Sequence, residues 1–287
     1  MAVALLETGD LQFAYGPHHW AIDGLRLRIF AGERIALVGA NGAGKSTLLH
    51  ICVGLHAPCG GELRLRGEPV PRNAAGSRRL RESVGLVLQD PNDQLFADTV
   101  EADVMFGPLN AGLTSAAAEQ RAASVLRAMH LDSIRERRIS TLSLGEKKRV
   151  AIAGILAMEP AVLLLDEPTA GLDHGGALAL IDCLEVLRNT GVAIVIATHN
   201  TDLALEWADR ILILESGRTI AEGAPQEILQ DEALCERARL RQPSLYRIAR
   251  ELRDRLALPP PDAPVTTAVD LADWLEASLA PKQEVLR

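Results

Sequence analysis

A glycine-rich loop between a short apolar run and a helical stretch constrains the fold more than any other feature. The loop reads G-A-N-G-A-G-K-S at residues 39–46 and fits the pattern G-x-x-x-x-G-K-[S/T]. Residues 35–38 before it have the length of a buried strand, and residues 46–56 after it are predicted to form a helix. Glycines let successive backbone N–H groups face one anion, and the helix adds the positive end of its dipole. The chain is therefore predicted to be an α/β protein that binds phosphate groups at this loop.

The residues of the loop have separate predicted roles around a nucleoside triphosphate and Mg²⁺. Lys45 supplies a mobile positive charge to the β- and γ-phosphates and is counted among the catalytic residues. The Ser46 hydroxyl is a predicted ligand of Mg²⁺. The other predicted phosphate-binding positions are Gly39, Asn41, Gly42, Ala43, Gly44 and Thr47.

Two carboxylates follow a second apolar run. Residues 161–165 read as a buried strand, and Asp166 and Glu167 come directly after it. The carboxyl ends of parallel strands border the ligand crevice of an α/β sheet. Asp166 is suited to hold Mg²⁺, and Glu167 is suited to orient and deprotonate an attacking water. Two acids after a strand are weak evidence alone, but together with the phosphate loop they predict a nucleotide hydrolase.

Strand and helix patterns surround these motifs. Alternation of apolar and charged residues predicts half-buried strands at 25–29 and 62–67. Residues 161–165, a helix over 176–189 and a strand over 192–198 form a predicted βαβ unit. We expect the apolar face of that helix to include Leu178, Ile181 and Leu184. Residues 211–214 and 218–221 read as a hairpin.

Composition changes twice along the chain, which suggests three regions. Residues 98–158 are rich in helix-forming residues, and 234–258 form a basic helical stretch. The prolines of 259–264 predict a semi-rigid linker before a last helix. We expect a nucleotide-binding core at 1–95 and 159–235, a helical subdomain at 96–158 and a C-terminal extension at 236–287. The last helix carries an apolar stripe, Leu271, Trp274, Leu275 and Leu279, that either packs on the chain's own core or contacts a second subunit.

Charge and hydropathy exclude some classes of protein. The 287 residues include 30 basic and 38 acidic side chains, a net charge of −8, which argues against nucleic acid as a partner. No apolar run approaches the roughly 18 residues of a membrane span. The 4 cysteines lack C-x-x-C spacing and are expected to be reduced thiols in a cytoplasmic protein. Any membrane attachment must therefore depend on a partner.

A second anion site is predicted upstream of the acidic strand. The segment L-S-L-G-E-K-K-R-V at 142–150 places Ser143 and Glu146 as a capping box, so Ser143 is expected to begin a helix. Alone, this would read as an ordinary helix cap. A capped helix start with a nearby glycine, Gly145, can also bind an anion.

Together the motifs resemble the ABC-transporter ATPase family over roughly residues 1–235. They are the phosphate loop, Gln89, L-S-L-G-E, L-L-L-D-E-P-T-A-G-L-D at 163–173, and His199. The resemblance implies a P-loop (RecA-like) ATPase core with an antiparallel β subdomain and a helical subdomain. It also implies that two ATPase domains face each other head to tail, with each ATP held between the phosphate loop of one and the L-S-L-G-E segment of the other.

By this resemblance, several residues acquire roles that the residues alone do not give. Ser143 and Gly145 would contact the γ-phosphate bound by the partner chain, and Asp173 would lie at the seam between sites. His199 would reach the γ-phosphate, and Gln89 would sense Mg²⁺ and water. Tyr15 would stack on adenine. As alternatives, His199 and Tyr15 are ordinary packing residues. The family's commonest segment is L-S-G-G-Q, from which this chain departs at Leu144 and Glu146.

Further segments are similar to one branch of the family. The segments at 89–96 and 99–108 resemble the ATPase subunits of energy-coupling-factor importers, and residues 145–160 resemble the cobalt and nickel type, the CbiO family. This implies ATP hydrolysis driving cobalt or nickel uptake at the cytoplasmic face of the membrane. The implied partners are a second ATPase subunit, expected as a homodimer, a transmembrane scaffold and a substrate-capture protein.

Other functions stay open at this point. The chain could serve a vitamin importer or another ABC importer, or be a soluble ABC ATPase in DNA repair or translation. Apolar residues beside the Gln89 segment either receive the scaffold or pack in the core; they are Leu95, Phe96, Val100, Val104 and Phe106.

Overall fold

The structure is a computed structural model that describes residues 3–17, 19–188, 190–261 and 263–279. Its helices and strands follow one another along the chain as β1 (Leu6–Gly16), β2 (His19–Ile29), β3 (Arg34–Val38), α1 (Lys45–Cys52), β4 (Gly60–Leu65), β5 (Glu68–Pro69), α2 (Ala74–Ser83), β6 (Val84–Val87), η1 (Pro91–Asp93), α3 (Val100–Asn110), α4 (Ser115–Ala128), η2 (Asp132–Ile134), η3 (Ile139–Thr141), α5 (Leu144–Leu156), β7 (Val162–Asp166), α6 (His174–Arg188), β8 (Ala193–Thr198), α7 (Thr201–Trp207), β9 (Arg210–Glu215), β10 (Arg218–Gly223), α8 (Pro225–Leu229), α9 (Glu232–Arg237), α10 (Ser244–Leu256) and α11 (Ala268–Leu279).

A six-stranded sheet forms the centre, in the order β10-β9-β3-β8-β7-β6. From β9 to β6 the paired strands are parallel, and β10 closes the edge as the predicted antiparallel hairpin with β9. Every residue of β7 and β8 is buried, as expected for strands covered on both faces. The α/β expectation is confirmed, and the parallel pairing brings the carboxyl ends of β3, β8 and β7 to one edge.

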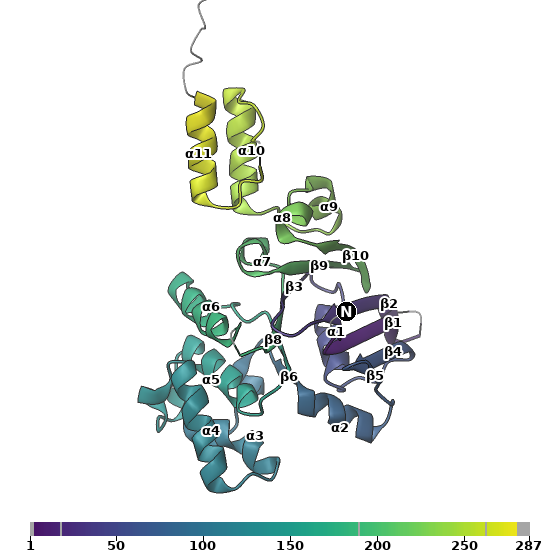
Figure 1. Cartoon of the computed structure of the whole chain (residues 1–287), viewed down its shortest axis with the longest axis vertical. Helices are drawn as coiled ribbons and strands as arrows, with labels where there is room; N and C mark the ends of the chain where they lie inside the picture. Colours follow the sequence, from purple (N-terminus) through teal and green to yellow (C-terminus); the bar gives the residue numbers. More distant parts are fainter. Residues whose placement is uncertain (1–2, 18, 189, 262, 280–287) are drawn as a thin grey trace, which may run out of the picture.

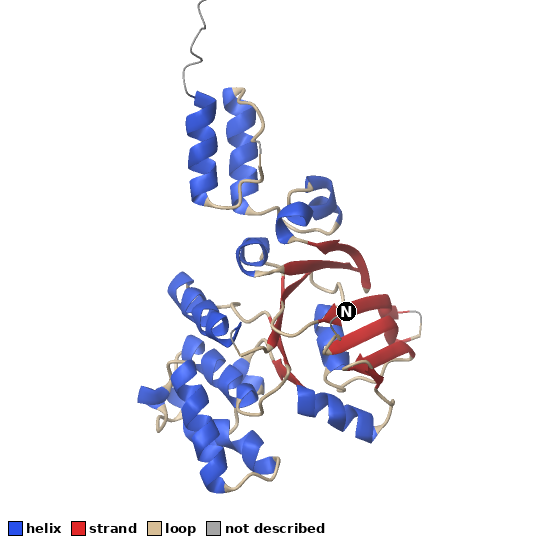
Figure 2. Cartoon of the chain, viewed as in Figure 1, coloured by secondary structure: helices blue, strands red, loops and turns tan. Residues whose placement is uncertain are grey.

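The second sheet is antiparallel, in the order β2-β1-β4-β5. Side-chain alternation on the central strands creates a core on each face. On β3, Ile35 and Leu37 pack with α1 and the antiparallel sheet, whereas Ala36 and Val38 pack with the helices of the other face. Figure 2 shows helices α3–α6 on the side of the six-stranded sheet away from the antiparallel sheet.

The apolar residues beside the Gln89 segment divide between the two expected roles. Val100 and Val104 of α3 are buried, as is Leu95. The side chains of Phe96 and Phe106 remain 62% and 44% exposed, with their rings 4.4 Å apart in an edge-to-face arrangement. Core packing therefore accounts for three of the five residues.

Three predictions about helices need correction. Helix α1 ends at Cys52 rather than residue 56, because the chain turns at Gly54, which has a left-handed φ of 72°. The basic stretch 234–258 contains most of α9 and all of α10, and residues 238–243 separate the two helices. On α6, Leu178 is exposed; Leu180 and Leu184 lie on the buried face. Residue 189, its predicted last residue, lies outside the described residues.

Helices α10 and α11 lie side by side and extend away from the two sheets (Figure 1). Trp274 of α11 is buried against Ala249 of α10 and Val265, and its Nε1 donates to the Pro259 carbonyl at 3.1 Å. Of the apolar stripe of the last helix, Leu271, Trp274 and Leu275 therefore pack in a small cluster with α10 rather than on the central core, whereas Leu279 is exposed. Among the described residues, no helix combines the length and apolarity needed to cross a membrane.

Candidate functional site

The phosphate loop runs from the end of β3 to the start of α1, as its sequence predicts. Gly44 caps α1 with a φ of 107°, and a Cβ there would lie 2.5 Å from the Ala21 carbonyl oxygen. A Cβ on Gly39 would lie 2.7 Å from the carbonyl oxygen of Leu214. Only glycine fits at these two positions, because neighbouring backbone approaches the loop on both sides.

The Lys45 ammonium lies inside the loop. Its Nζ donates to the carbonyls of Gly39 at 2.6 Å and Ala40 at 3.3 Å, and lies 4.0 Å from Oε1 of Glu167. Burial lowers the pKa of Lys45, and the charges of Glu167 and Asp166 oppose this shift. The ammonium group is thus held at the glycine loop, where it can bind a phosphate oxygen of a polyanionic ligand.

Asp166 ends β7 and faces the start of α1. Its carboxylate accepts a hydrogen bond from Ser46, and Gln89 lines the same pocket. Burial is the largest influence and raises the pKa of Asp166, while the Ser46 hydrogen bond and the Lys45 charge oppose it. A hydroxyl, a carboxylate and an amide oxygen are hard donors of the kind Mg²⁺ prefers, so these residues fit the ion.

Glu167 is held at both its backbone and its carboxylate. Its φ is 43°, a left-handed conformation, and its N–H donates to the Ala197 carbonyl at 2.9 Å. Thr198 Oγ1 donates to Oε2 at 3.1 Å, and His199 Nδ1 lies 2.7 Å from Oε1. The acid that the sequence marks as the base therefore has hydrogen-bond contacts with three successive residues, Ala197, Thr198 and His199.

A pocket of about 420 Å³ joins these groups. Its wall includes Tyr15, whose ring is 60% exposed and whose Oη lies 3.1 Å from Oγ1 of Thr47. Trp20, 49% exposed, is a second aromatic residue in the wall. The complete lining is Tyr15, His19, Trp20, Ala21, Asn41, Gly42, Gly44, Lys45, Ser46, Thr47, Gln89, Asp166, Glu167 and Ser216.

Most of the predicted site residues meet in or beside this pocket. Gly39 and His199 reach it through hydrogen bonds to Lys45 and Glu167. Ala43 is buried, and its carbonyl accepts from the Gly217 N–H at 2.9 Å. Sequence analysis missed Trp20, Ser216 and Thr198. The only signal for Trp20 is an aromatic residue a few positions after Tyr15, close to where β1 turns back into β2.

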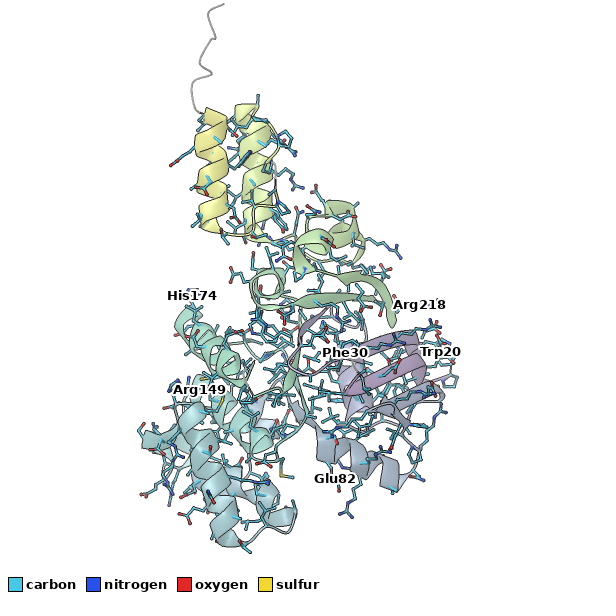
Figure 3. The ribbon with its side chains drawn as sticks, in the orientation of Figure 1. Trp20, Phe30, Glu82, Arg149, His174 and Arg218 are labelled. Carbon is cyan, nitrogen blue, oxygen red and sulfur yellow. The ribbon has the colours of Figure 1, made fainter. Side chains whose placement is uncertain are left out.

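Three predicted site residues do not reach the pocket: Ser143, Gly145 and Asp173. Ser143 caps α5, and the predicted capping box with Glu146 is present in both directions. The N–H of Ser143 donates to Glu146, which lowers the pKa of that carboxyl. Asp173 directly precedes His174, the first residue of α6. His174 and Trp20 lie on opposite sides of the molecule in Figure 3.

Comparison with known proteins identifies similar chains for most of this length. A family described as "ABC transporter" matches residues 22–170. The energy-coupling factor transporter ATP-binding protein EcfA2 of Methanospirillum hungatei is 44% identical over 272 residues, 95% of this chain and 68% of that protein. The EcfA protein of Methanocaldococcus jannaschii is 40% identical over 255 residues, covering 89% and 91% of the two chains.

Solved structures are also similar. CbiO1 from Clostridium perfringens, described as part of the ABC transporter complex CbiONQ, superimposes with a TM-score of 0.76 at 35% identity, covering 89% of this chain and 96% of that chain. A dimeric ATP-binding cassette in a post-hydrolysis state, bound to ADP and Pi, has a TM-score of 0.68 at 25% identity, covering 77% and 98% of the two chains.

Proposed function

We propose that this protein powers an importer. The premise is that the chain belongs to the ABC transporter family, as an ATP-binding subunit of the energy-coupling factor type. It is an ATPase of an energy-coupling factor transporter. The cargo that we propose is cobalt or nickel ion. The similarity to CbiO1 over most of both chains supports this cargo, as does the sequence of residues 145–160.

One observation carries the chemistry: Glu167 lies in the same pocket as Lys45 and Asp166, and its two carboxylate oxygens contact Thr198, the last residue of β8, and His199, which follows it. Fixed in this way, the carboxylate can accept a proton from a water aligned with the γ-phosphate. His199 and Thr198 keep it oriented. Because these contacts hold the carboxylate in one orientation, little reorganisation is needed at the moment of reaction.

The remaining pocket residues bind ATP. Tyr15 offers its ring to the base, and the loop backbone with Lys45 surrounds the phosphates. Ser46, Asp166 and Gln89 would hold Mg²⁺, which neutralises charge on the phosphate oxygens when bound.

We further propose that a second ATPase subunit completes each site. Ser143, Gly145 and Asp173 lie outside the pocket of their own chain, yet Ser143 presents a capped, exposed helix start suited to an anion. In a head-to-tail homodimer this helix start meets the γ-phosphate bound by the partner. The post-hydrolysis cassette that resembles this chain is a dimer.

The membrane partners follow from the same proposal. The exposed pair Phe96 and Phe106, beside the Gln89 segment, is the surface we assign to a transmembrane scaffold subunit. That scaffold would carry a substrate-capture protein and hold the ATPase at the cytoplasmic face of the membrane.

Reconstitution tests this proposal. The chain is assembled with its scaffold and capture subunits in vesicles, and uptake of cobalt, nickel and vitamins is measured with and without ATP. We expect ATP-dependent uptake of cobalt or nickel. Uptake of a vitamin alone would contradict the cargo assignment.

The Glu167→Gln variant separates the ATPase from the cargo in the same assay. It should lower kcat by about 10²- to 10⁴-fold, while the Kd for ATP changes by no more than about twofold. Glu82→Gln is the matched control, because Glu82 is an exposed residue of α2 (Figure 3). Its carboxylate pairs with Arg78. Unchanged turnover in Glu167→Gln would remove Glu167 from the reaction.

A further inference from the structure

Lys148 is a buried lysine that the mechanism above does not use. It lies in α5, five residues after the cap Ser143, and is 4% exposed. Its Nζ donates to the backbone carbonyls of Glu167 at 3.2 Å and Pro168 at 2.8 Å. Burial lowers the pKa of Lys148, and the charges of Glu167 and Asp90 partly offset that shift. Burying an ammonium group is unfavourable, so its two carbonyl partners identify what the lysine holds in place.

The peptide that Lys148 holds is the one that sets the direction of the Glu167 side chain. Glu167 has a φ of 43°, a conformation that non-glycine residues adopt only where surrounding contacts enforce it. On the N–H side, the Ala197 carbonyl of β8 provides that contact. On the carbonyl side, the ammonium of Lys148 does so. The backbone of Glu167 is thus fixed from the sheet on one side and from α5 on the other.

A second contact joins the same face of α5 to the same turn. Leu144 precedes Lys148 by four residues, so the two side chains project from one face of the helix. A Leu144 Cδ2 lies 3.1 Å from where a Cβ of Gly171 would be. The turn that follows Glu167 is therefore held by α5 at both ends, next to the helix start at Ser143.

We propose that Lys148 is a positioning residue for hydrolysis, which fixes the Glu167–Pro168 backbone and couples the Glu167 carboxylate to the helix that begins at Ser143. This proposal rests on the proposed function, in which Glu167 is the base. A displacement of α5, when Ser143 engages the nucleotide of the partner subunit, moves the ammonium and hence the carboxylate of its own site. Lys148 thereby links the two sites of the dimer.

The test compares variants of the full chain in steady-state ATP hydrolysis and in binding of a fluorescent ATP analogue. Lys148→Met, which keeps the length of the side chain but not its charge, should lower kcat by about 10- to 100-fold and leave KM and Kd within about twofold. Lys148→Arg should restore most of the loss, because a guanidinium can donate to the same carbonyls. Lys147→Met is the matched control, because Lys147 is the adjacent lysine and its ammonium donates to Asn92 instead. The kcat of Lys147→Met should stay within about twofold of wild type.

A double-mutant cycle distinguishes positioning from general support of the fold. In the Glu167→Gln background, Lys148→Met should cause no further loss of kcat, because its effect passes through Glu167. Additive losses, a raised KM with unchanged kcat, or wild-type turnover in Lys148→Met would each overturn the proposal. Thermal unfolding of each variant shows whether a loss of kcat reflects misfolding. If Lys148→Met is misfolded, the kcat of Lys148→Arg and the double-mutant cycle decide whether Lys148 acts through Glu167. Metal uptake is measured separately. If the proposed cargo is wrong, the Lys148 variants should still show the expected changes in hydrolysis.

Discussion

His199 Nδ1 lies 2.7 Å from Oε1 of Glu167, at the ends of two adjacent parallel strands. An ionised carboxylate accepts, so the histidine Nδ1 is the donor in this hydrogen bond. Thr198, the preceding residue, donates to the other oxygen of the same carboxylate. Two consecutive residues of β8 and its following turn thus fix both oxygens of the base, and this pairing depends on β7 and β8 being neighbours in the sheet.

Replacing His199 with alanine should slow hydrolysis more than it weakens ATP binding. A hydrogen bond to a charged group is worth about 1.5–3 kcal/mol, so kcat should fall by about 10- to 150-fold. His199→Gln, whose amide can donate to the same oxygen, should recover part of the rate. Single-turnover hydrolysis measures the effect, and a kcat for His199→Ala equal to wild type would contradict it.

The raised pKa of Asp166 predicts how ion binding depends on pH. A carboxyl with a raised pKa stays protonated up to a higher pH than an ordinary one, so Mg²⁺-dependent affinity for ATP should decline earlier as pH falls. We expect the decline to begin at a higher pH than protonation of an ordinary aspartate would give, measured by titration of MgATP against ATP with EDTA. Asp166→Asn, which cannot ionise, should bind MgATP weakly and show no such decline. If the affinity for MgATP depends on pH in the same way in wild type and in Asp166→Asn, Asp166 is not an ion ligand.

The phosphate loop should tolerate no side chain at Gly44. In Gly44→Ala the new Cβ combines a left-handed φ of 107° with a 2.5 Å approach to the Ala21 carbonyl. Gly24 is the matched control, because its φ of 76° is also left-handed but its Cβ would meet nothing within 4 Å. Gly24→Ala should cost about 1 kcal/mol of unfolding free energy, and Gly44→Ala more, with loss of ATP binding. Urea unfolding and nucleotide titration check this; equal costs at both sites would show that the close approach is unimportant.

Mixing two inactive variants tests the shared site. Ser143→Ala leaves the pocket of its own chain intact, and Lys45→Ala leaves the start of α5 intact. Each homodimer should be nearly inactive, whereas a mixed dimer contains one complete site and should recover up to about half of wild-type turnover. ATPase assays of the mixture, with dimer formation followed by light scattering, provide the measurement. No recovery despite mixed dimers, or full activity of Ser143→Ala alone, would refute the composite site.

Local patterns in the sequence were sufficient for several of these features. The glycine loop, the acids after β7 and the Ser143–Glu146 capping box each depend on residues a few positions apart, so spacing alone predicts them. The parallel pairing of β7 and β8 followed because a helical stretch separates two buried apolar runs. The same approach placed Leu178 on the wrong face of α6, because which face is buried depends on what packs against the helix.

Other features were decided only when distant segments packed together. In sequence, Lys148 is one cation among several in a helix, and Thr198 is an ordinary strand residue. Their roles appear because α5 and β8 both pack against the turn after β7. Lys148 and Thr198 lie 19 and 31 residues away from Glu167 in the chain. The short-range chemistry of the nucleotide site is therefore encoded in local spacing. The groups that hold the base Glu167 in place come from distant parts of the chain. Burial of the two hydrophobic cores brings them together, so no pattern of neighbouring residues reveals them.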